Sequence, residues 1–224
     1  MSLASRDEPT TSRKRRVTPS DWAVLGFTLL YIAGATPWAL LRGNIEFLLY
    51  VAVMLLMIGL VAAIHLRVGL SREVLVGLSL WGLIHMAGGL MPVPEGWPIH
   101  GDKRVLYSLW LIPDYLKYDQ LVHAFGFGVT TWVCWQGLCA ATGVRRPTVG
   151  LLLLCAAAGM GFGAVNEVVE FIATLSVPET NVGGYANTGW DLVANGVGAA
   201  AAVTLIAVGN RKAAKEEQRA SAMS

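Results

Sequence analysis

The chain has 224 residues, of which 54% are hydrophobic and only 14% are charged, and its mean hydropathy is +0.54. Soluble domains usually carry about 25% charged residues, so this composition is that of a membrane protein. It excludes a disordered chain, a disulfide scaffold and a large catalytic domain outside the bilayer, while the net charge of +2 says little about partners.

Six apolar runs follow one another along the chain, and each approaches the ~20 residues that a helix needs to cross a bilayer. They predict an all-α membrane protein with about six transmembrane helices, the last four of which form a bundle around a polar cluster. The runs cover residues 22–41, 45–66, 74–91, 120–140, 148–175 and 190–208. A basic segment at 1–20 precedes this transmembrane domain of 21–209, and a tail at 210–224 follows it.

The first run also fits a signal peptide, because it follows a basic head and contains the small residues Ala33, Gly34 and Ala35. The apolar stretch continues from Trp38 to Leu41, past any cleavage at those residues, which favours an uncleaved span. A cleaved form would leave the orientation of the later spans unchanged.

Basic residues gather on one side of the predicted spans. Thirteen of the seventeen Lys and Arg residues fall there, and cytoplasmic loops are the ones that carry such an excess. We therefore expect a multi-pass protein of the bacterial plasma membrane with both termini in the cytoplasm. The thirteen are Arg6, Arg13, Lys14, Arg15, Arg16, Arg67, Arg72, Arg145, Arg146, Arg211, Lys212, Lys215 and Arg219.

One long loop, residues 92–118, joins the third and fourth runs on the predicted outer side and is rich in tryptophan and tyrosine. Aromatic side chains of this kind usually lie at the level of the lipid headgroups. Within this loop, residues 104–112 fit a short interfacial helix and a plain loop about equally well.

Polar and ionisable side chains interrupt the last four runs or lie at their edges. A charged side chain deep in a bilayer costs about 2.5 to 3.5 kcal/mol on insertion scales. Since none of the four runs contains Lys or Arg, the four carboxylates need protons, a cation or water to compensate their charge. The polar residues are His85, Asp119, His123, Glu167, Glu170, Asp191 and Asn195.

The depths of these seven residues agree once the orientation is applied. Odd runs lead outward and even runs lead inward, and at ~1.5 Å per residue all seven fall within roughly 15 Å of the outer boundary. Residues three or four apart also share a helix face. Three such pairs occur, namely Asp119 with His123, Glu167 with Glu170, and Asp191 with Asn195.

Taken singly, these residues also have structural explanations. Asp119 fits a helix N-terminus, and Asp191 fits a capping box with Thr188. The histidines and the asparagine fit core residues that bond a neighbouring helix. Glu167 and Glu170 are the hardest to explain in that way, because two carboxylates a turn apart in an apolar helix are functional by default.

Four short stretches, 84–89, 118–123, 166–170 and 190–198, carry a resemblance to known families. Their succession resembles the YjdF-type bacterial inner-membrane proteins and, more distantly, the VanZ-like proteins. The resemblance implies a multi-pass plasma-membrane protein and sharpens the set of site residues more than the reaction. The residues that match the VanZ-like pattern are Asp119, His123, Glu167, Asp191, Asn195 and Gly198.

A metal-dependent membrane enzyme is the first functional hypothesis. Histidine and carboxylate ligands without thiolate suit Zn²⁺, Mn²⁺ or Fe²⁺, and such a metal can activate a water for hydrolysis of lipid or lipid-linked envelope substrates. Glu170 would then be the general base. The expected metal ligands are His85, His123, Glu167 and Asp191, and the residues expected to orient a histidine are Asp119 and Asn195.

Two other functions fit the same residues. A proton- or cation-coupled permease would use the acids as a relay, but such a carrier should also have polar groups towards the inner side, where the sequence has few. A non-catalytic envelope factor would bind a lipid or a partner through the aromatic loop. Under each hypothesis we expect membrane lipids as partners and no nucleic acid.

Overall fold

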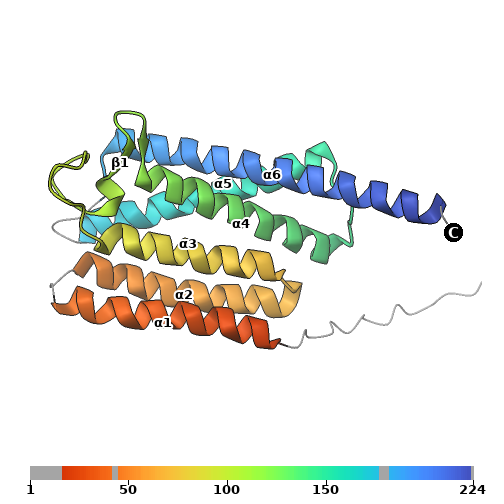
Figure 1. The fold of residues 1–224 in the computed structure, drawn as a ribbon, viewed down its shortest axis with the longest axis horizontal. Helices are drawn as coiled ribbons and strands as arrows, with labels where there is room; N and C mark the ends of the chain where they lie inside the picture. Colours follow the sequence, from red (N-terminus) through yellow and green to blue (C-terminus); the bar gives the residue numbers. More distant parts are fainter. Residues whose placement is uncertain (1–16, 42–44, 177–181, 223–224) are drawn as a thin grey trace, which may run out of the picture.

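The computed structural model describes residues 17–41, 45–176 and 182–222. Within them the chain forms six long helices that run alternately up and down one bundle (Figure 1). The predicted all-α membrane fold is thereby confirmed, whereas most of the basic segment 1–20 lies outside the described residues. The helices are α1 (Pro19–Leu41), α2 (Ile45–Val68), α3 (Arg72–Leu90), α4 (Tyr118–Thr142), α5 (Val149–Ser176) and α6 (Tyr185–Ala222).

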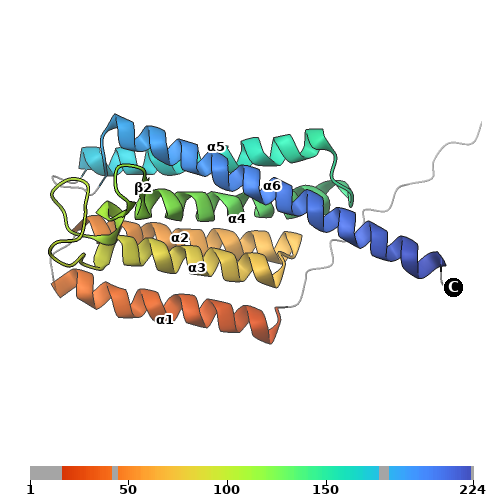
Figure 2. The ribbon, with the colours of Figure 1, turned by 45° about the horizontal axis from the view of Figure 1, so that its top comes forward.

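The two ends of the bundle differ. The long segment 91–117 covers one end, which we call the loop end. Helix α1 starts and helix α6 finishes at the opposite end, which we call the chain end (Figure 1). Helix α6 projects beyond the other helices there (Figure 2), because it continues as a helix through the predicted tail to Ala222.

Five helices, α1, α2, α3, α5 and α6, are both long and apolar enough to cross a membrane. Helix α4 has 25 residues, which is also sufficient length, but polar residues such as Gln120 and His123 lower its hydropathy. It packs mainly against α3, α5 and α6. Protein rather than lipid therefore surrounds much of its surface, which explains why the least apolar helix of the bundle is tolerated.

Two helices begin with side-chain caps. At α1 the backbone N–H of Thr18 donates to Asp21, and the hydroxyl of Thr18 accepts from the N–H of Asp21. At α3 the hydroxyl of Ser71 accepts from the N–H of Val74. The cap predicted from Thr188 and Asp191 is wrong, since α6 already begins at Tyr185 and both residues lie inside the helix.

The loop segment contains small regular elements instead of an interfacial helix. A 3₁₀ turn, η1 (Leu106–Ser108), precedes a two-stranded antiparallel hairpin of β1 (Trp110–Ile112) and β2 (Leu116–Lys117). The guanidinium of Arg104 donates to backbone carbonyls of residues 93, 94 and 97 and ties the loop together. The hairpin leads directly into α4, so it fixes where that helix begins.

Glycines allow α4, α5 and α6 to pack closely. A side chain on Gly198 of α6 would collide with the carbonyl of Ala124 in α4, and one on Gly128 would lie 3.1 Å from the Gly198 carbonyl. In α5, Gly159 faces Thr131 of α4 and Gly163 faces α6. The glycines of α5 thus allow close packing between helices, as small residues do in membranes. They do not interrupt the helix, which is continuous from Val149 to Ser176.

Candidate functional site

Six of the seven predicted polar residues meet at the loop end of the bundle. We call them the loop-end cluster; they come from the first turns of α4, the last turns of α5 and the loop-end part of α6. Their convergence agrees with the common depth expected from the sequence. The cluster consists of Asp119, His123, Glu167, Glu170, Asp191 and Asn195.

His123 is the centre of the cluster and is only 4% exposed. Its Nε2 atom lies 3.7 Å from Oδ1 of Asp119 and 3.9 Å from Oε1 of Glu170. Its Nδ1 atom lies 3.1 Å from Oδ1 of Asn195 and 3.6 Å from Oε1 of Glu167. The imidazole therefore contacts carboxylates of two helices and an amide of a third.

The hydrogen bond to Asn195 determines which ring nitrogen of His123 carries the proton and which carries the lone pair. In this arrangement Oδ1 of Asn195 accepts the proton of Nδ1, so the lone pair of the neutral ring lies on Nε2. Nε2 is the atom that faces Asp119 and Glu170. The predicted role of Asn195, to orient a histidine, fits this geometry.

Asp191 and Asn195 are completely buried, at 0% exposure each. Oδ2 of Asp191 accepts a hydrogen bond from Nδ2 of Asn187, while Oδ1 has no hydrogen-bond partner among the described residues. Since α6 begins at Tyr185, well before Asp191, the burial of this residue is not explained by helix capping. A carboxylate oxygen that is buried and unpaired is costly and indicates a missing partner.

Lys117 contacts the cluster and is absent from the residues that the sequence predicts. It is 6% exposed, and its ammonium lies 3.6 Å from Oδ2 of Asp119 and donates to Oδ1 of Asn187. The cluster therefore has a basic neighbour, although that neighbour stands before the predicted run and belongs to strand β2. Its position two residues before Asp119 was the available signal.

Two asparagines also join the cluster without having been predicted. Nδ2 of Asn187 donates to Asp191 and, at 3.4 Å, to Oδ2 of Asp119. Nδ2 of Asn166 donates to Oε1 of Glu170 at 2.8 Å. Each lies four residues from an acid on the same helix, so the i,i+4 spacing that linked the predicted pairs also points to them.

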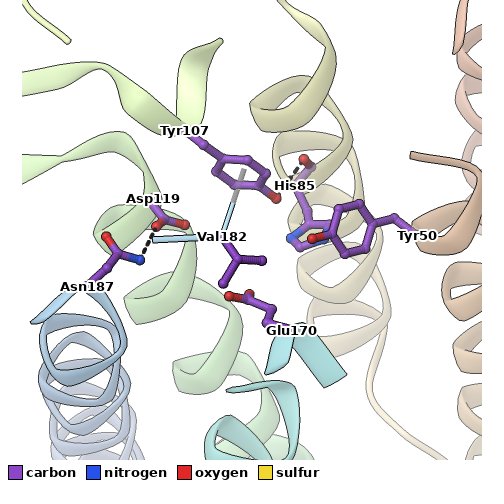
Figure 3. A pocket seen from close by; sticks show the side chains of 7 residues that line it. All are labelled: Tyr50, His85, Tyr107, Asp119, Glu170, Val182 and Asn187. Carbon is purple, nitrogen blue, oxygen red and sulfur yellow. Dashed lines mark hydrogen bonds between the residues drawn. The ribbon is translucent and has the colours of Figure 1, made fainter. Parts of the chain in front are cut away.

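His85 lies across a small cavity from the acids rather than inside the cluster (Figure 3). The cavity measures about 20 Å³, which is room for roughly one water molecule or ion. The ring of His85 packs edge-on against Tyr50 and Tyr107, with centroids 5.7 and 5.5 Å apart. The cavity is lined by Tyr50, His85, Tyr107, Asp119, Glu170, Val182 and Asn187.

Tyr107 brings the loop into the site. Its hydroxyl donates to the backbone carbonyl of His85 at 2.8 Å, and its ring packs on Gly88, where any side chain would collide with it. Burial, with the nearby carboxylates of Asp119 and Glu170, raises the pKa of Tyr107 well above its usual range. The hydroxyl therefore stays protonated and remains a donor at neutral pH.

Two overlapping groups of three side chains have ligand atoms within 4.8 Å of one another. We call Asp119, His123 and Asp191 the aspartate group, and His123, Glu167 and Glu170 the glutamate group. Ligands about 2.1 Å from one transition-metal ion stand roughly 3.4 Å apart, close to the 3.7 and 3.9 Å that separate Nε2 of His123 from Asp119 and Glu170. His85 belongs to neither group of described residues.

The charges of the cluster are only partly compensated within the described chain. Four carboxylates face one ammonium, that of Lys117. Glu167, whose side chain is 8% exposed, accepts no hydrogen bond at either oxygen from the described residues. Such a site can hold a divalent cation or retain protons on its acids, and both would supply what the unpaired oxygens lack.

A comparison with protein families matches residues 22–212 to the family described as "Predicted membrane protein (DUF2238)". No curated protein and no solved structure matches the chain. The matched range contains the whole loop-end cluster together with Lys117 and the residues that line the cavity. It agrees with the resemblance to YjdF-type proteins and gives no support to the more distant VanZ-like link.

Proposed function

The chain belongs to the DUF2238 family of membrane proteins, and from that premise we propose that its loop-end cluster binds a divalent transition metal. We further propose that this centre hydrolyses lipid or lipid-linked envelope substrates. The observation that carries the proposal is the placement of carboxylates from three helices around the buried imidazole of His123, with ligand atoms within 4.8 Å.

The composition of the cluster favours a transition metal. An imidazole with carboxylates and no thiolate suits Zn²⁺, Mn²⁺ or Fe²⁺. A metal of this kind supplies a nucleophilic water at neutral pH. The amide of Asn195 would hold His123 as metal-bound histidines are usually held, by a partner on the other ring nitrogen.

Unpaired oxygens support the metal over a purely structural network. Oδ1 of Asp191 and both oxygens of Glu167 are buried without a hydrogen bond from the described residues. In a network that served only to join helices, each buried polar atom would be expected to have a hydrogen-bond partner. A buried carboxylate oxygen without a partner costs more stability than a single hydrogen bond contributes.

The cavity beside the cluster fits the position of an attacking water. It has room for roughly one water molecule, and both Asp119 and Glu170 line it. Either carboxylate is placed to accept a proton from that water, and Glu170 is the general base expected from the sequence. His85 and the hydroxyl-bearing rings of Tyr50 and Tyr107 form the opposite wall (Figure 3).

Bound metal is the first measurement. We expect near-stoichiometric Zn, Mn or Fe in the purified protein by elemental mass spectrometry, and loss of most of it in the double variant Glu167→Gln, His123→Ala. The double variant Glu73→Gln, His100→Ala is the matched control, because it removes the same residue types outside the cluster. It should keep the metal.

Lipid turnover is the second measurement. Protein in vesicles of bacterial polar lipids would be incubated with the retained metal, and the lipids compared by mass spectrometry with vesicles that contain the Glu167→Gln, His123→Ala variant. A product that only the intact centre releases would support hydrolysis. Absence of metal after reloading would overturn the proposal, and uptake driven by a pH gradient would then favour the permease.

A further inference from the structure

The aspartate group and the glutamate group differ in how far the protein already compensates their charge. In the aspartate group, the ammonium of Lys117 lies 3.6 Å from Asp119. Nδ2 of Asn187 donates to both Asp119 and Asp191. A cation and a shared amide donor are therefore built into this group, in which Oδ1 of Asp191 alone among the buried oxygens has no hydrogen-bond partner from the described residues.

Lys117 also determines the orientation of that amide. A lysine ammonium can only donate hydrogen bonds, and its partner is Oδ1 of Asn187. The amide nitrogen of Asn187 must then point away from Lys117, towards Asp119 and Asp191. One buried lysine thus directs two hydrogen bonds at the acids in addition to its own charge.

The glutamate group lacks such compensation. No donor among the described residues forms a hydrogen bond with either oxygen of Glu167, although the side chains of Thr188 and Asn166 are close to it. Oε1 of Glu170 accepts a hydrogen bond from Asn166. Among the same residues neither glutamate forms an ion pair with a lysine or arginine; His123 is their charged or chargeable partner. The uncompensated charge therefore lies on the α5 side of His123.

We propose that the metal binds in the glutamate group and that Lys117 is a built-in cation that keeps the aspartate group free of metal. This inference rests on the metal centre proposed above and specifies its ligands and its occupancy. A divalent ion between Asp119 and Asp191 would stand close to the Lys117 ammonium, and like charges at such distances in a buried site repel strongly. One ion, not two, occupies the cluster.

The proposal changes the roles of two carboxylates. Glu170 becomes a metal ligand together with Glu167 and His123. Asp119, which lines the same cavity and is held by Lys117, becomes the carboxylate that faces a water in that cavity. Lys117 is then a positioning residue, since it acts through Asp119 and Asn187.

Metal stoichiometry in Lys117 variants tests the proposal. The intact protein, Lys117→Met and Lys117→Arg would be loaded with excess Mn²⁺ in detergent, freed of unbound metal and measured by elemental mass spectrometry. We expect about one Mn per chain in the intact protein and in Lys117→Arg, and a second equivalent in Lys117→Met. Lys117→Met keeps a long side chain without the charge, whereas Lys117→Arg keeps the charge, so the difference between the two variants reports the charge.

Two double variants test the ligands without depending on the folding of Lys117→Met. Asp119→Asn, Asp191→Asn should keep about one Mn, and Glu167→Gln, Glu170→Gln should lose it. Metal retained by the glutamate variant, or a folded Lys117→Met protein that stays at one equivalent, would overturn the inference and leave the metal centre standing. An intact protein that takes up no Mn²⁺, Zn²⁺ or Fe²⁺ would overturn both.

Discussion

Gly163 makes room for the amide that holds His123. A side chain on Gly163 would overlap the side chain of Asn195, with its β-carbon 2.8 Å from the amide carbon. That amide accepts the hydrogen bond from Nδ1 of His123. A residue of α5 without any side chain is therefore part of what orients the central histidine of α4.

Gly163→Ala is predicted to weaken metal binding without removing a ligand. The added methyl group displaces Asn195, and loss of the partner that orients a ligating histidine typically costs 10- to 100-fold in metal affinity, so a drop of about that size is expected. Competition with a chelator of known affinity measures it. Gly161→Ala is the control, because nothing lies within 4 Å of the β-carbon that this substitution adds. Equal metal affinities in the two variants would contradict the role assigned to Gly163.

The sequence predicts the acids and His123 for a physical reason that does not extend to their partners. A carboxylate in an apolar helix is expensive, so Glu167 and Asp191 are conspicuous from their apolar neighbours alone. A lysine in a loop is ordinary, so Lys117 is not conspicuous from its neighbours, and its nearness to Asp119 in the sequence is the signal that it gives. Only the fold shows that the hairpin turns this lysine inward to 6% exposure.

Helices α4 and α6 form the most extensive contact between described helices. Gly198 approaches the carbonyl of Ala124, and Gly128 faces the carbonyl of Gly198. Van der Waals packing of this kind is a main source of stability between helices in a membrane, where lipid is as apolar as the side chains. The same contact holds Asp191 and Asn195 of α6 beside Asp119 and His123 of α4.

Gly198→Ala is predicted to destabilise the protein by forcing α6 away from α4. Inserting a methyl group into a well-packed contact costs about 1 to 3 kcal/mol, which corresponds to a fall in Tm of roughly 2 °C or more for a chain of this size. Thermal unfolding in detergent measures it. Gly209→Ala, at an open position of the same helix, should leave Tm unchanged or raise it through helix propensity; a similar fall there would argue against the packing explanation.

Helix positions follow from hydropathy, whereas helix ends need information that the apolar pattern lacks. All six predicted runs correspond to helices of the structure. The apolar pattern predicts the start of α6 five residues too late, because residues 185–189 are not apolar and yet belong to the helix. The hairpin of β1 and β2 was missed for a similar reason, since strands of three and two residues are too short to show a period.

At the scale of the molecule, polarity is concentrated at one end. The loop-end cluster, Lys117 and the cavity all lie beside the loop segment, while both described chain ends are at the chain end (Figure 1). A second buried pair, His65 with Asp21 at 3.4 Å, joins α1 and α2 near the chain end. It comes from the two helices that contribute nothing to the loop-end cluster.

The orientation of the bundle in the membrane is the last prediction. Eight basic residues of the described chain lie at the chain end or in the segments that join helices there, and five more precede α1 in the sequence; such an excess faces the cytoplasm. We therefore expect the loop end, and with it the cluster, to face outward.

In right-side-out vesicles a membrane-impermeant maleimide should label Asp102→Cys at once, and Ala214→Cys only after detergent is added. The native cysteines lie within α4 and α5, so the unmodified protein gives the background. The reverse pattern would direct the search for substrates to the cytoplasmic leaflet, because a site enclosed by helices at one end of a bundle is open only to the side that this end faces.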